Sequence, residues 1–276
     1  MPAILTKKIT LNNGVEMPMI GYGTYLVTDQ AKGLAAITHA INYGYQLIDT
    51  ADIYHNHQLV REAIKNSNQP RENLFITTKI WITNKNPEIV KADIDRILAE
   101  LGTDYLDLVL VHWPLPDGVM IYQTLEEIYQ TGKIRAIGVS NFMIDQLKTL
   151  LEQTTIVPVV NQVELHPQLP LLELQEFCQK HNIVLESWQT IMKGKVSDLP
   201  YLQTLAAKYN VDAPAIALKW ALQRGIIVIP KSETLTRIES NVQQLENFEL
   251  SAEEITAIND LGPTLRLGPD PYHFVG

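Results

Sequence analysis

The sequence predicts an α/β protein built as a (β/α)₈ barrel, also called a TIM barrel, with an N-terminal β-hairpin. Two observations lead to this prediction. Short apolar runs alternate with helical patterns along the chain, which is typical of parallel α/β architectures. The alternation repeats eight times in 276 residues, a length that suits one barrel better than two small domains. We therefore expect residues 1–276 to form a single barrel domain.

The first predicted element is the hairpin, in which residues 8–11 and 15–17 flank Asn13-Gly14. This dipeptide favours a tight two-residue turn. The apolar runs that follow are expected to be buried parallel strands. They lie at residues 19–21, 46–48, 74–77, 106–111, 134–139, 159–163, 184–186 and 226–229.

Helical patterns occupy the segments between these runs, and several begin at a proline or end near a glycine. Clear examples are residues 88–101, 121–130, 145–151, 171–181 and 214–223. The tail, residues 261–276, contains three prolines and three glycines. We expect it to run as coil over the surface.

The composition limits the classes of partner. A net charge of -9 argues against a surface built for nucleic acid or anionic lipid, and no apolar run approaches membrane-spanning length. Cys178 is the one cysteine, so no internal disulfide is expected, and the N-terminal segment lacks the apolar stretch of a signal peptide. These observations predict a cytoplasmic protein without membrane or nucleic-acid partners. No long exposed apolar helix stands out, so a monomer is expected.

Polar or aromatic residues follow the predicted strands, at the end of the barrel where active sites form. They are Asp49, Lys79, His112, Ser140, Asn141, Glu164, Trp188 and Lys231. Each of them alone is ordinary at the start of a loop. An ion-pairable Asp49 and Lys79 with a histidine and a tyrosine on adjacent strands indicate a reactive site. The structural alternative for Asp49 and Lys79 is a plain ion pair that closes the barrel top.

Five motifs now carry a family resemblance. They are I-D-T-A-D-I-Y ending at Tyr54, F-I-T-T-K-I-W around Lys79, L-V-L-V-H-W-P around His112, I-G-V-S-N-F around Asn141, and I-P-K-S-x-x-x-x-R-I-x-x-N from Ile229 to Asn241. In this order and spacing they resemble the aldo-keto reductases, over about residues 11–271. Short loops after the fourth strand and in the tail resemble the bacterial branch that contains 2,5-diketo-gluconate and methylglyoxal reductases.

The residue types fit the reduction of a carbonyl group, which needs a hydride at carbon and a proton at oxygen. Tyr54 is the expected proton donor, and a cationic Lys79 is expected to lower its pKa toward working pH. Asp49 would pair with Lys79 and hold it in place. His112 can donate a hydrogen bond to the carbonyl oxygen. The resemblance implies the same four roles, and hence reduction of small aldehydes, ketones or diketo compounds to alcohols.

The resemblance also implies a nicotinamide cofactor. Ser140, Asn141 and Gln162 would hold the nicotinamide carboxamide, since these side chains both donate and accept hydrogen bonds. Trp188 would stack on the ring; its structural alternative is a core tryptophan. Gly23 and Thr24 are assigned to the same site. Tyr25, Trp81 and Trp113 are expected to line an aromatic substrate pocket above the nicotinamide.

The phosphate groups of the cofactor need another site, because the chain lacks the G-x-G-x-x-G motif of Rossmann folds. Lys231 and Ser232, followed by Thr234 and Arg237, offer two cations and two hydroxyls near a helix start. This set suits a 2′-phosphate and therefore favours NADPH/NADP⁺ over the NADH couple. The resemblance further places Arg237 and Asn241 at the adenine.

Three segments depart from the family pattern. His55-Asn56-His57 stands where Gly-Asn-Glu is common, and we expect a solvated or substrate-facing loop there. No third ligand accompanies the two histidines, so no metal site is predicted. Gln189-Thr190-Ile191 replaces Gly-Pro-Leu, which bears on pyrophosphate binding. Ser240 replaces a glutamate beside the adenine site, which bears on the preference for the 2′-phosphate.

Two other functions remain open at this point. A barrel lysine can form a Schiff base, so Lys79 could serve a lyase or aldolase. Alternatively, the chain could bind NADPH as a regulatory subunit without catalysis. Trapping with borohydride would reveal the first, and binding without turnover would indicate the second.

Overall fold

The computed structural model describes residues 2–83 and 85–275. The two limits of the predicted domain, residues 1 and 276, lie outside the described residues, as does the last residue of the predicted tail.

A barrel of parallel strands forms the centre of the molecule. Within the described ranges, eight strands are hydrogen-bonded in the order β10-β9-β8-β7-β6-β5-β4-β3. A parallel bridge between Ile20 and Val228 joins the two edges, and the Val228 N–H donates to the Met19 carbonyl over 3.1 Å. The strands are β3 (Gly21–Gly23), β4 (Leu47–Asp49), β5 (Phe75–Ile80), β6 (Leu108–Val111), β7 (Ile137–Ser140), β8 (Val160–Glu164), β9 (Val184–Trp188) and β10 (Ile227–Val228). The predicted (β/α)₈ barrel is confirmed.

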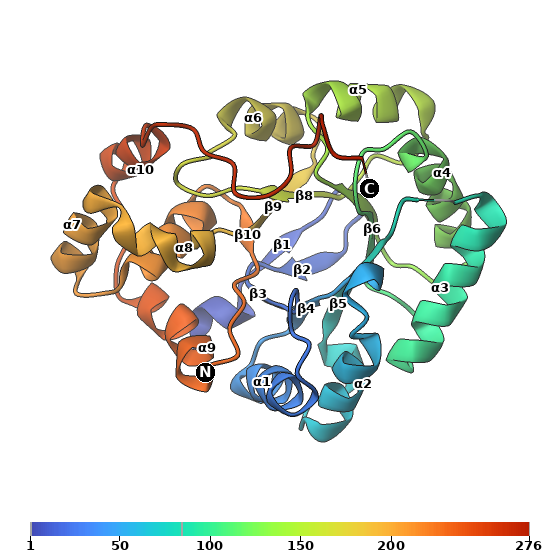
Figure 1. Cartoon of the computed structure of the whole chain (residues 1–276), viewed down its shortest axis with the longest axis horizontal. Helices are drawn as coiled ribbons and strands as arrows, with labels where there is room; N and C mark the ends of the chain where they lie inside the picture. The colour runs from blue at the N-terminus through green and yellow to red at the C-terminus, as the bar shows by residue number, and fades with distance from the viewer. Residues whose placement is uncertain (1, 84, 276) are drawn as a thin grey trace.

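The helices surround the strands, as Figure 1 shows. Their apolar faces supply much of the core, and side chains at Asp29, Asn86, Asp212 and Ser251 cap four of the helix starts by accepting backbone N–H bonds. The helices are α1 (Gln30–Tyr43), α2 (His57–Asn66), α3 (Pro87–Leu101), α4 (Gly118–Tyr129), α5 (Ile144–Gln153), α6 (Leu172–Lys180), α7 (Pro200–Tyr209), α8 (Ala213–Gln223), α9 (Leu235–Gln243) and α10 (Ala252–Asn259).

The predicted N-terminal hairpin is also confirmed. It pairs β1 (Lys8–Thr10) with β2 (Glu16–Pro18) in antiparallel register, and Gly14 in the turn has a φ of 85°, which favours glycine. Asn12 Nδ2 donates to the carbonyls of Pro158 and Asn182, which lie just before β8 and β9. The hairpin therefore covers the end of the barrel at which the strands begin, and it leaves the other end open for a site.

Within the described residues, we find no helix that combines the length and the apolar character needed to cross a membrane.

Candidate active site

Lys79 is the centre of a buried hydrogen-bond cluster at the carboxyl ends of the strands. Its side chain is 1% exposed, and its Nζ lies 2.7 and 2.8 Å from the two carboxylate oxygens of Asp49. The same nitrogen donates to the carbonyl of Thr50 over 2.9 Å and lies 3.5 Å from the hydroxyl of Tyr54. Three of the four residues predicted to carry the chemistry thus meet around one cation.

The local fold explains how Tyr54 arrives there. Asp49 ends β4, and a single 3₁₀ turn (Asp52–Tyr54) follows it and turns the tyrosine back toward β5. Asn56 holds this segment against the loop after β3. Its Oδ1 accepts from Thr50 Oγ1 over 2.7 Å, and its Nδ2 donates to the Thr24 carbonyl over 3.0 Å. Thr24, predicted to touch the cofactor, uses its own hydroxyl to bind the Asp49 carbonyl.

Burial controls the proton on Tyr54. Desolvation raises the pKa of Tyr54 to about 12, and the nearby Lys79 ammonium opposes this rise only in part. The expected net lowering by Lys79 is therefore wrong: the loss of hydration outweighs the attraction of one cation that is already paired with Asp49. Tyr54 keeps its proton through the neutral pH range, which is the state a proton donor needs.

Lys79 itself stays charged. Burial disfavours its ammonium form, but the Asp49 carboxylate and the Tyr54 oxygen outweigh burial, so the pKa of Lys79 is raised. Asp49 is 2% exposed, and the pair forms a nearly solvent-free ion pair. Such a pair resists separation because either partner alone would leave an uncompensated buried charge.

His112 follows β6 and completes the predicted set. Burial and the nearby Lys79 hold the pKa of His112 well below its usual range, so the ring is neutral. Its ring centroid lies 5.9 Å from that of Tyr54 and 5.3 Å from that of Trp81, and its Nδ1 is buried without a partner among the described residues. A neutral imidazole in this place can donate one N–H to an uncharged carbonyl oxygen.

The residues predicted to hold the nicotinamide lie together at the ends of β7, β8 and β9. Ser140 Oγ donates to the Gln162 carbonyl over 2.9 Å, and Asn141 Nδ2 donates to the His112 carbonyl over 3.0 Å. Asn141 Oδ1 accepts from Trp188 Nε1 over 2.9 Å, which fixes the plane of the indole. Asn141 has a φ of 67°, a left-handed conformation that asparagine tolerates better than most residues.

Gln162 joins this group to the Lys79 cluster. Its Nε2 donates to Asp49 Oδ2 over 2.7 Å and to Glu186 Oε2 over 2.8 Å. Glu186 was not among the residues singled out from the sequence. A signal for it exists, because it is a charged residue in the middle of the strand V-L-E-S-W.

The predicted phosphate site extends from the end of β10 into α9. The hydroxyl of Ser232 accepts from the Thr234 N–H over 3.1 Å, and the exposed Arg237 lies in the first turn of the helix. Lys231 Nζ lies 2.8 Å from the carboxylate of Glu233, an acidic neighbour that sequence reasoning left out. Asn241 lies further along α9, and Gly23 approaches this loop closely, since a Cβ there would stand 2.9 Å from the Ile229 carbonyl.

Three aromatic side chains were expected to line a substrate pocket, and a fourth ring, from the tail, packs with two of them. Tyr25 is 55% exposed, and its ring centroid lies 5.0 Å from that of Tyr54. Trp113 stacks on Phe274 with centroids 4.1 Å apart, and Trp81 meets Phe274 edge-on at 6.0 Å. Phe274, from the tail, was missed because nothing in its local sequence reveals a contact with residues so far away in the chain.

The tail is coil, as expected, and nearly all of its described residues are exposed or half-buried. It has no helix or strand in its described part, but it folds back across the barrel end, where Figure 1 draws it in dark red. Glu164, which ends β8 and is fully buried, accepts backbone N–H bonds from Leu267 and Gly268. A Cβ at Gly268 would lie 2.4 Å from Trp188 Cη2, so only glycine allows the tail to pass so close to the indole.

His57 corrects the expectation of a solvated or substrate-facing loop. It lies in the first turn of α2, is 2% exposed, and its Nδ1 and Nε2 lie 2.9 Å from Glu100 and 3.0 Å from Thr78. Burial lowers its pKa, although Glu100 opposes this shift. His57 therefore anchors α2 to α3 and β5, while His55 remains exposed.

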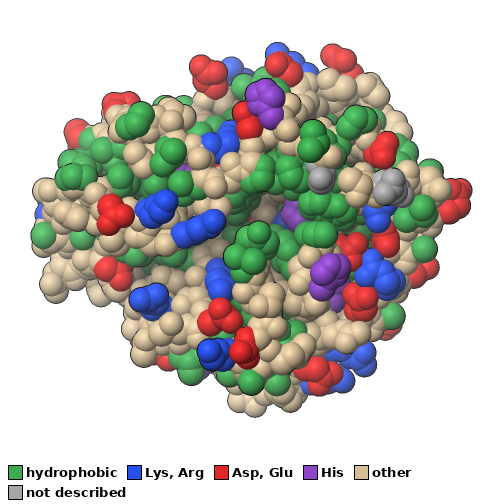
Figure 2. Space-filling view, viewed as in Figure 1, with side chains coloured by type: hydrophobic (Ala, Val, Ile, Leu, Met, Phe, Trp, Pro, Cys, Tyr) green, Lys and Arg blue, Asp and Glu red, His purple; other side chains and the backbone are tan. Residues whose placement is uncertain are grey.

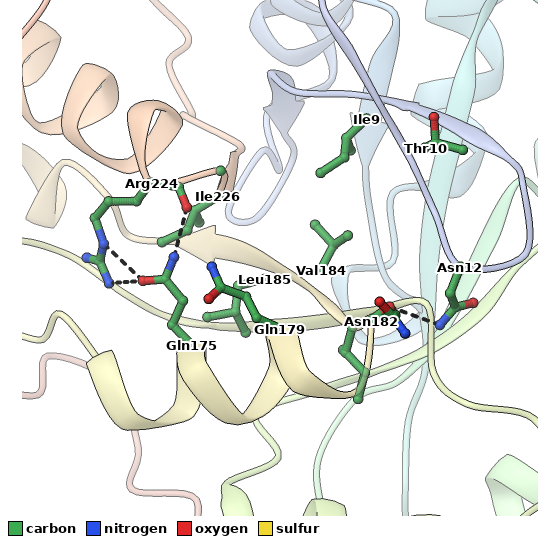
Figure 3. Close-up of a pocket in the computed structure, with 12 residues that line it drawn as sticks. Ile9, Thr10, Asn12, Gln175, Gln179, Asn182, Val184, Leu185, Arg224 and Ile226 are labelled. Carbon is green, nitrogen blue, oxygen red and sulfur yellow. Dashed lines mark hydrogen bonds between the residues drawn. The ribbon is translucent and has the colours of Figure 1, made fainter.

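A separate hollow of about 560 Å³ lies at the opposite end of the barrel, beside the hairpin. Figure 3 shows Arg224 paired with the Gln175 side chain, and Asn12 bound to the backbone carbonyl of Asn182. The clustered Asp49, Tyr54, Lys79 and His112 lie at the other end of the barrel, which makes that end the candidate active site.

Comparison with known proteins agrees with this geometry. The sequence model of the Aldo/keto reductase family matches residues 19–263. The glyoxal reductase of Bacillus subtilis (strain 168) is 42% identical over 272 residues, covering 98% of each chain, and the methylglyoxal reductase DkgA of Escherichia coli (strain K12) is 39% identical over 274 residues, covering 97% of this chain and 98% of that protein. The crystal structure of MGS-M4, an aldo-keto reductase from a Medee basin deep-sea metagenome library, superimposes with a TM-score of 0.92 at 37% identity, covering 97% of this chain and 99% of that one. This chain belongs to the aldo/keto reductase family.

Proposed function

We propose that the protein reduces small aldehydes and ketones, including dicarbonyl compounds, to alcohols, with NADPH as hydride donor and Tyr54 as proton donor. One observation carries the proposal: a protonated tyrosine, a paired lysine and a neutral histidine converge at the open end of the barrel. The relatives named as glyoxal and methylglyoxal reductases support the choice of small dicarbonyl compounds.

The reaction divides between cofactor and protein. When bound, NADPH supplies a hydride to the carbonyl carbon. His112 donates an N–H to the carbonyl oxygen and so orients it. The Tyr54 hydroxyl then transfers its proton to the same oxygen, which completes the alcohol and leaves a phenolate. Lys79, 3.5 Å away, stabilises that phenolate until a proton from solvent restores the hydroxyl.

The donor set fits a nicotinamide dinucleotide, the cofactor that this family generally uses. Gln162 Oε1 receives no hydrogen bond from the described residues, so it can accept from the carboxamide. Trp188 presents an indole whose plane is held by Asn141. Lys231 and Arg237 supply positive charge for a phosphate, and Ser232 and Thr234 supply hydroxyls. The Glu233 carboxylate beside Lys231 competes with a 2′-phosphate, so we expect NADPH to be preferred over NADH by a modest factor.

The charge state of Lys79 favours reduction over Schiff-base chemistry. A Schiff base needs a neutral amine with a free lone pair. Here the Nζ protons are directed at Asp49, Thr50 and Tyr54, and the raised pKa keeps the group as an ammonium.

The test mixes purified protein with NADPH and a panel of carbonyls: methylglyoxal, a nitrobenzaldehyde and a diketo sugar acid. Oxidation is followed by the absorbance of the reduced nicotinamide, and the assay is repeated with NADH. Replacing the proton donor, Tyr54→Phe, is expected to lower kcat by about 10²–10⁴-fold while NADPH still binds, because only the proton transfer is lost. Tyr43→Phe, on the outer helix α1, is the matched control and should behave as wild type.

Other outcomes separate the alternatives. NADPH binding with no turnover on any carbonyl would favour the regulatory-subunit function, and trapping of substrate by borohydride would favour the lyase. Failure to bind NADPH would contradict the proposal. We further propose a cytoplasmic monomer, and light scattering after size-exclusion chromatography measures the mass in solution.

A further inference from the structure

Glu186 is a buried carboxyl group that the reaction described above does not use. It lies in β9 with its side chain inside the barrel and is fully buried. Its Oε2 accepts from Gln162 Nε2 over 2.8 Å, and its Oε1 is buried without a partner among the described residues. A buried carboxyl in an apolar strand is costly, so its contact with Gln162 needs an explanation.

The bond to Glu186 uses the second N–H of the Gln162 amide. The first N–H goes to Asp49 Oδ2 over 2.7 Å, so both donors of the amide point into the barrel. The amide oxygen receives no bond from the described residues and is not among the atoms sealed from solvent. It is the one polar atom of this side chain still available to a ligand.

We propose that Glu186 is a positioning residue, which holds the Gln162 amide in one orientation so that its oxygen accepts an N–H from the nicotinamide carboxamide. This inference rests on the proposed function. With Asp49 as the only acceptor, the amide could pivot about a single hydrogen bond. A second acceptor on the neighbouring strand removes that rotation, because Gln162 and Glu186 are paired in register across β8 and β9.

The charges around Glu186 agree with this role. The charged or polar groups that reach it are Asp49 from β4, Lys79 from β5 and Gln162 from β8. Burial and repulsion from Asp49 raise the pKa of Glu186 to about 8, so near neutral pH it is largely protonated. A neutral Glu186 accepts from Gln162 without adding a second negative charge beside the Asp49–Lys79 pair.

The experiment compares two cofactors that differ only at the carboxamide. NADP⁺ carries amide N–H donors, whereas its 3-acetylpyridine analogue keeps the carbonyl and lacks them. Dissociation constants are measured by quenching of tryptophan fluorescence for wild type, Glu186→Leu and Glu186→Gln. Ser187→Ala is the matched control, since it removes buried hydrogen bonds of the same strand that do not involve Gln162.

We expect wild type to bind NADP⁺ about tenfold more tightly than the analogue, the value of one well-placed hydrogen bond. Glu186→Leu should weaken NADP⁺ binding by about the same factor and leave the analogue nearly unchanged, so the preference disappears. Glu186→Gln should restore it, because the introduced amide oxygen accepts the same N–H. Ser187→Ala should keep the wild-type preference.

An unchanged preference in Glu186→Leu would overturn the inference while leaving the proposed function intact. Failure of wild type to bind NADP⁺ or to oxidise NADPH would instead overturn the proposed function. If Glu186→Leu does not fold, the inference is tested instead by measuring side-chain amide proton exchange by NMR in the wild-type protein labelled with ¹⁵N-glutamine. Both Gln162 amide protons should then be protected from exchange, because each is hydrogen-bonded to a buried carboxyl group. Rapid exchange of this amide would overturn the inference.

Discussion

Single residues at the barrel mouth depend on one another through the charge of Lys79. Its ammonium is shared by Asp49, which neutralises it, and by Tyr54, whose phenolate it would stabilise in the proposed reaction. The same pairing makes the fold sensitive to the loss of either partner, because neither charge is hydrated and the remaining one would be buried without compensation. Function and stability can therefore be separated by removing one partner or both.

Lys79→Met should abolish reduction and lower the free energy of unfolding by about 3–5 kcal/mol, because Asp49 is left as an unpaired buried carboxylate. The double variant Asp49→Asn/Lys79→Met should recover much of the lost stability and none of the activity. Urea unfolding and the NADPH assay measure the two effects. Equal stability of the single and double variants would show that the buried charge is not the cause.

Glu186 should make stability depend on pH. Its pKa is raised from 4.5 in the unfolded chain to about 8 in the fold, so between these values the folded state holds a proton that the unfolded state has lost. The free energy of unfolding contributed by this group is thus complete below pH 4.5 and is lost as pH rises through about 8. Urea midpoints of wild type should fall more steeply over this range than those of Glu186→Gln. Parallel curves would contradict the prediction.

At the scale of elements, the tail acts as a wall of the site although it has no regular structure. Glu164 holds its middle through backbone N–H groups, and Gln146 Nε2 donates to the Pro271 carbonyl further along. These contacts bring Phe274 onto Trp113. The end of β8 and helix α5 therefore hold the tail in place, although the tail has no helix or strand of its own in its described part.

Glu164→Gln should loosen the tail, since an amide has one acceptor oxygen where the carboxylate has two, and it loses the charge that strengthens bonds from N–H groups. The KM for aromatic aldehydes should rise several-fold while the dissociation constant of NADPH stays within about twofold, and limited proteolysis should cut the tail faster. Glu249→Gln, on the outer surface beside Lys219, serves as the control. A change in NADPH affinity alone would assign Glu164 to the cofactor site instead.

The elements that could be predicted from the sequence are those whose signal is local. All eight strands lie within about three residues of the predicted runs, because buried parallel strands are mostly apolar and this bias is a local signal. Asp49, Lys79 and His112 could be named for a related reason, since each lies just past an apolar run that predicted a strand. The Phe274 contact, the Glu164 bonds to the tail and the burial of His57 depend on residues tens of positions away, and no local pattern encodes them. The pKa of Tyr54 was misjudged because burial cannot be read from its neighbours in sequence.

At the scale of the whole molecule, charge is unevenly placed. The net charge is -9, yet lysine and arginine side chains lie beside the central hollow on the face drawn in Figure 2. We expect these side chains to attract an anionic ligand to this face of the protein.

Salt should therefore weaken cofactor binding. Raising the ionic strength from 0.01 to 0.15 M shortens the screening distance from about 30 Å to about 8 Å, and the KM for NADPH should rise several-fold. The KM for uncharged methylglyoxal should hardly change, which serves as the internal control. Steady-state kinetics at fixed pH measures both, and a salt-independent KM for NADPH would argue against a charged phosphate site.

The position of Phe274 has a practical consequence for anyone handling the protein. Because this residue stacks on Trp113, a peptide joined shortly after it would emerge beside the proposed substrate entrance. The hairpin near the other terminus caps the opposite end of the barrel, away from that opening. A purification tag fused at the C-terminus would act as a competing occupant of the entrance, whereas a tag at the N-terminus would leave it clear.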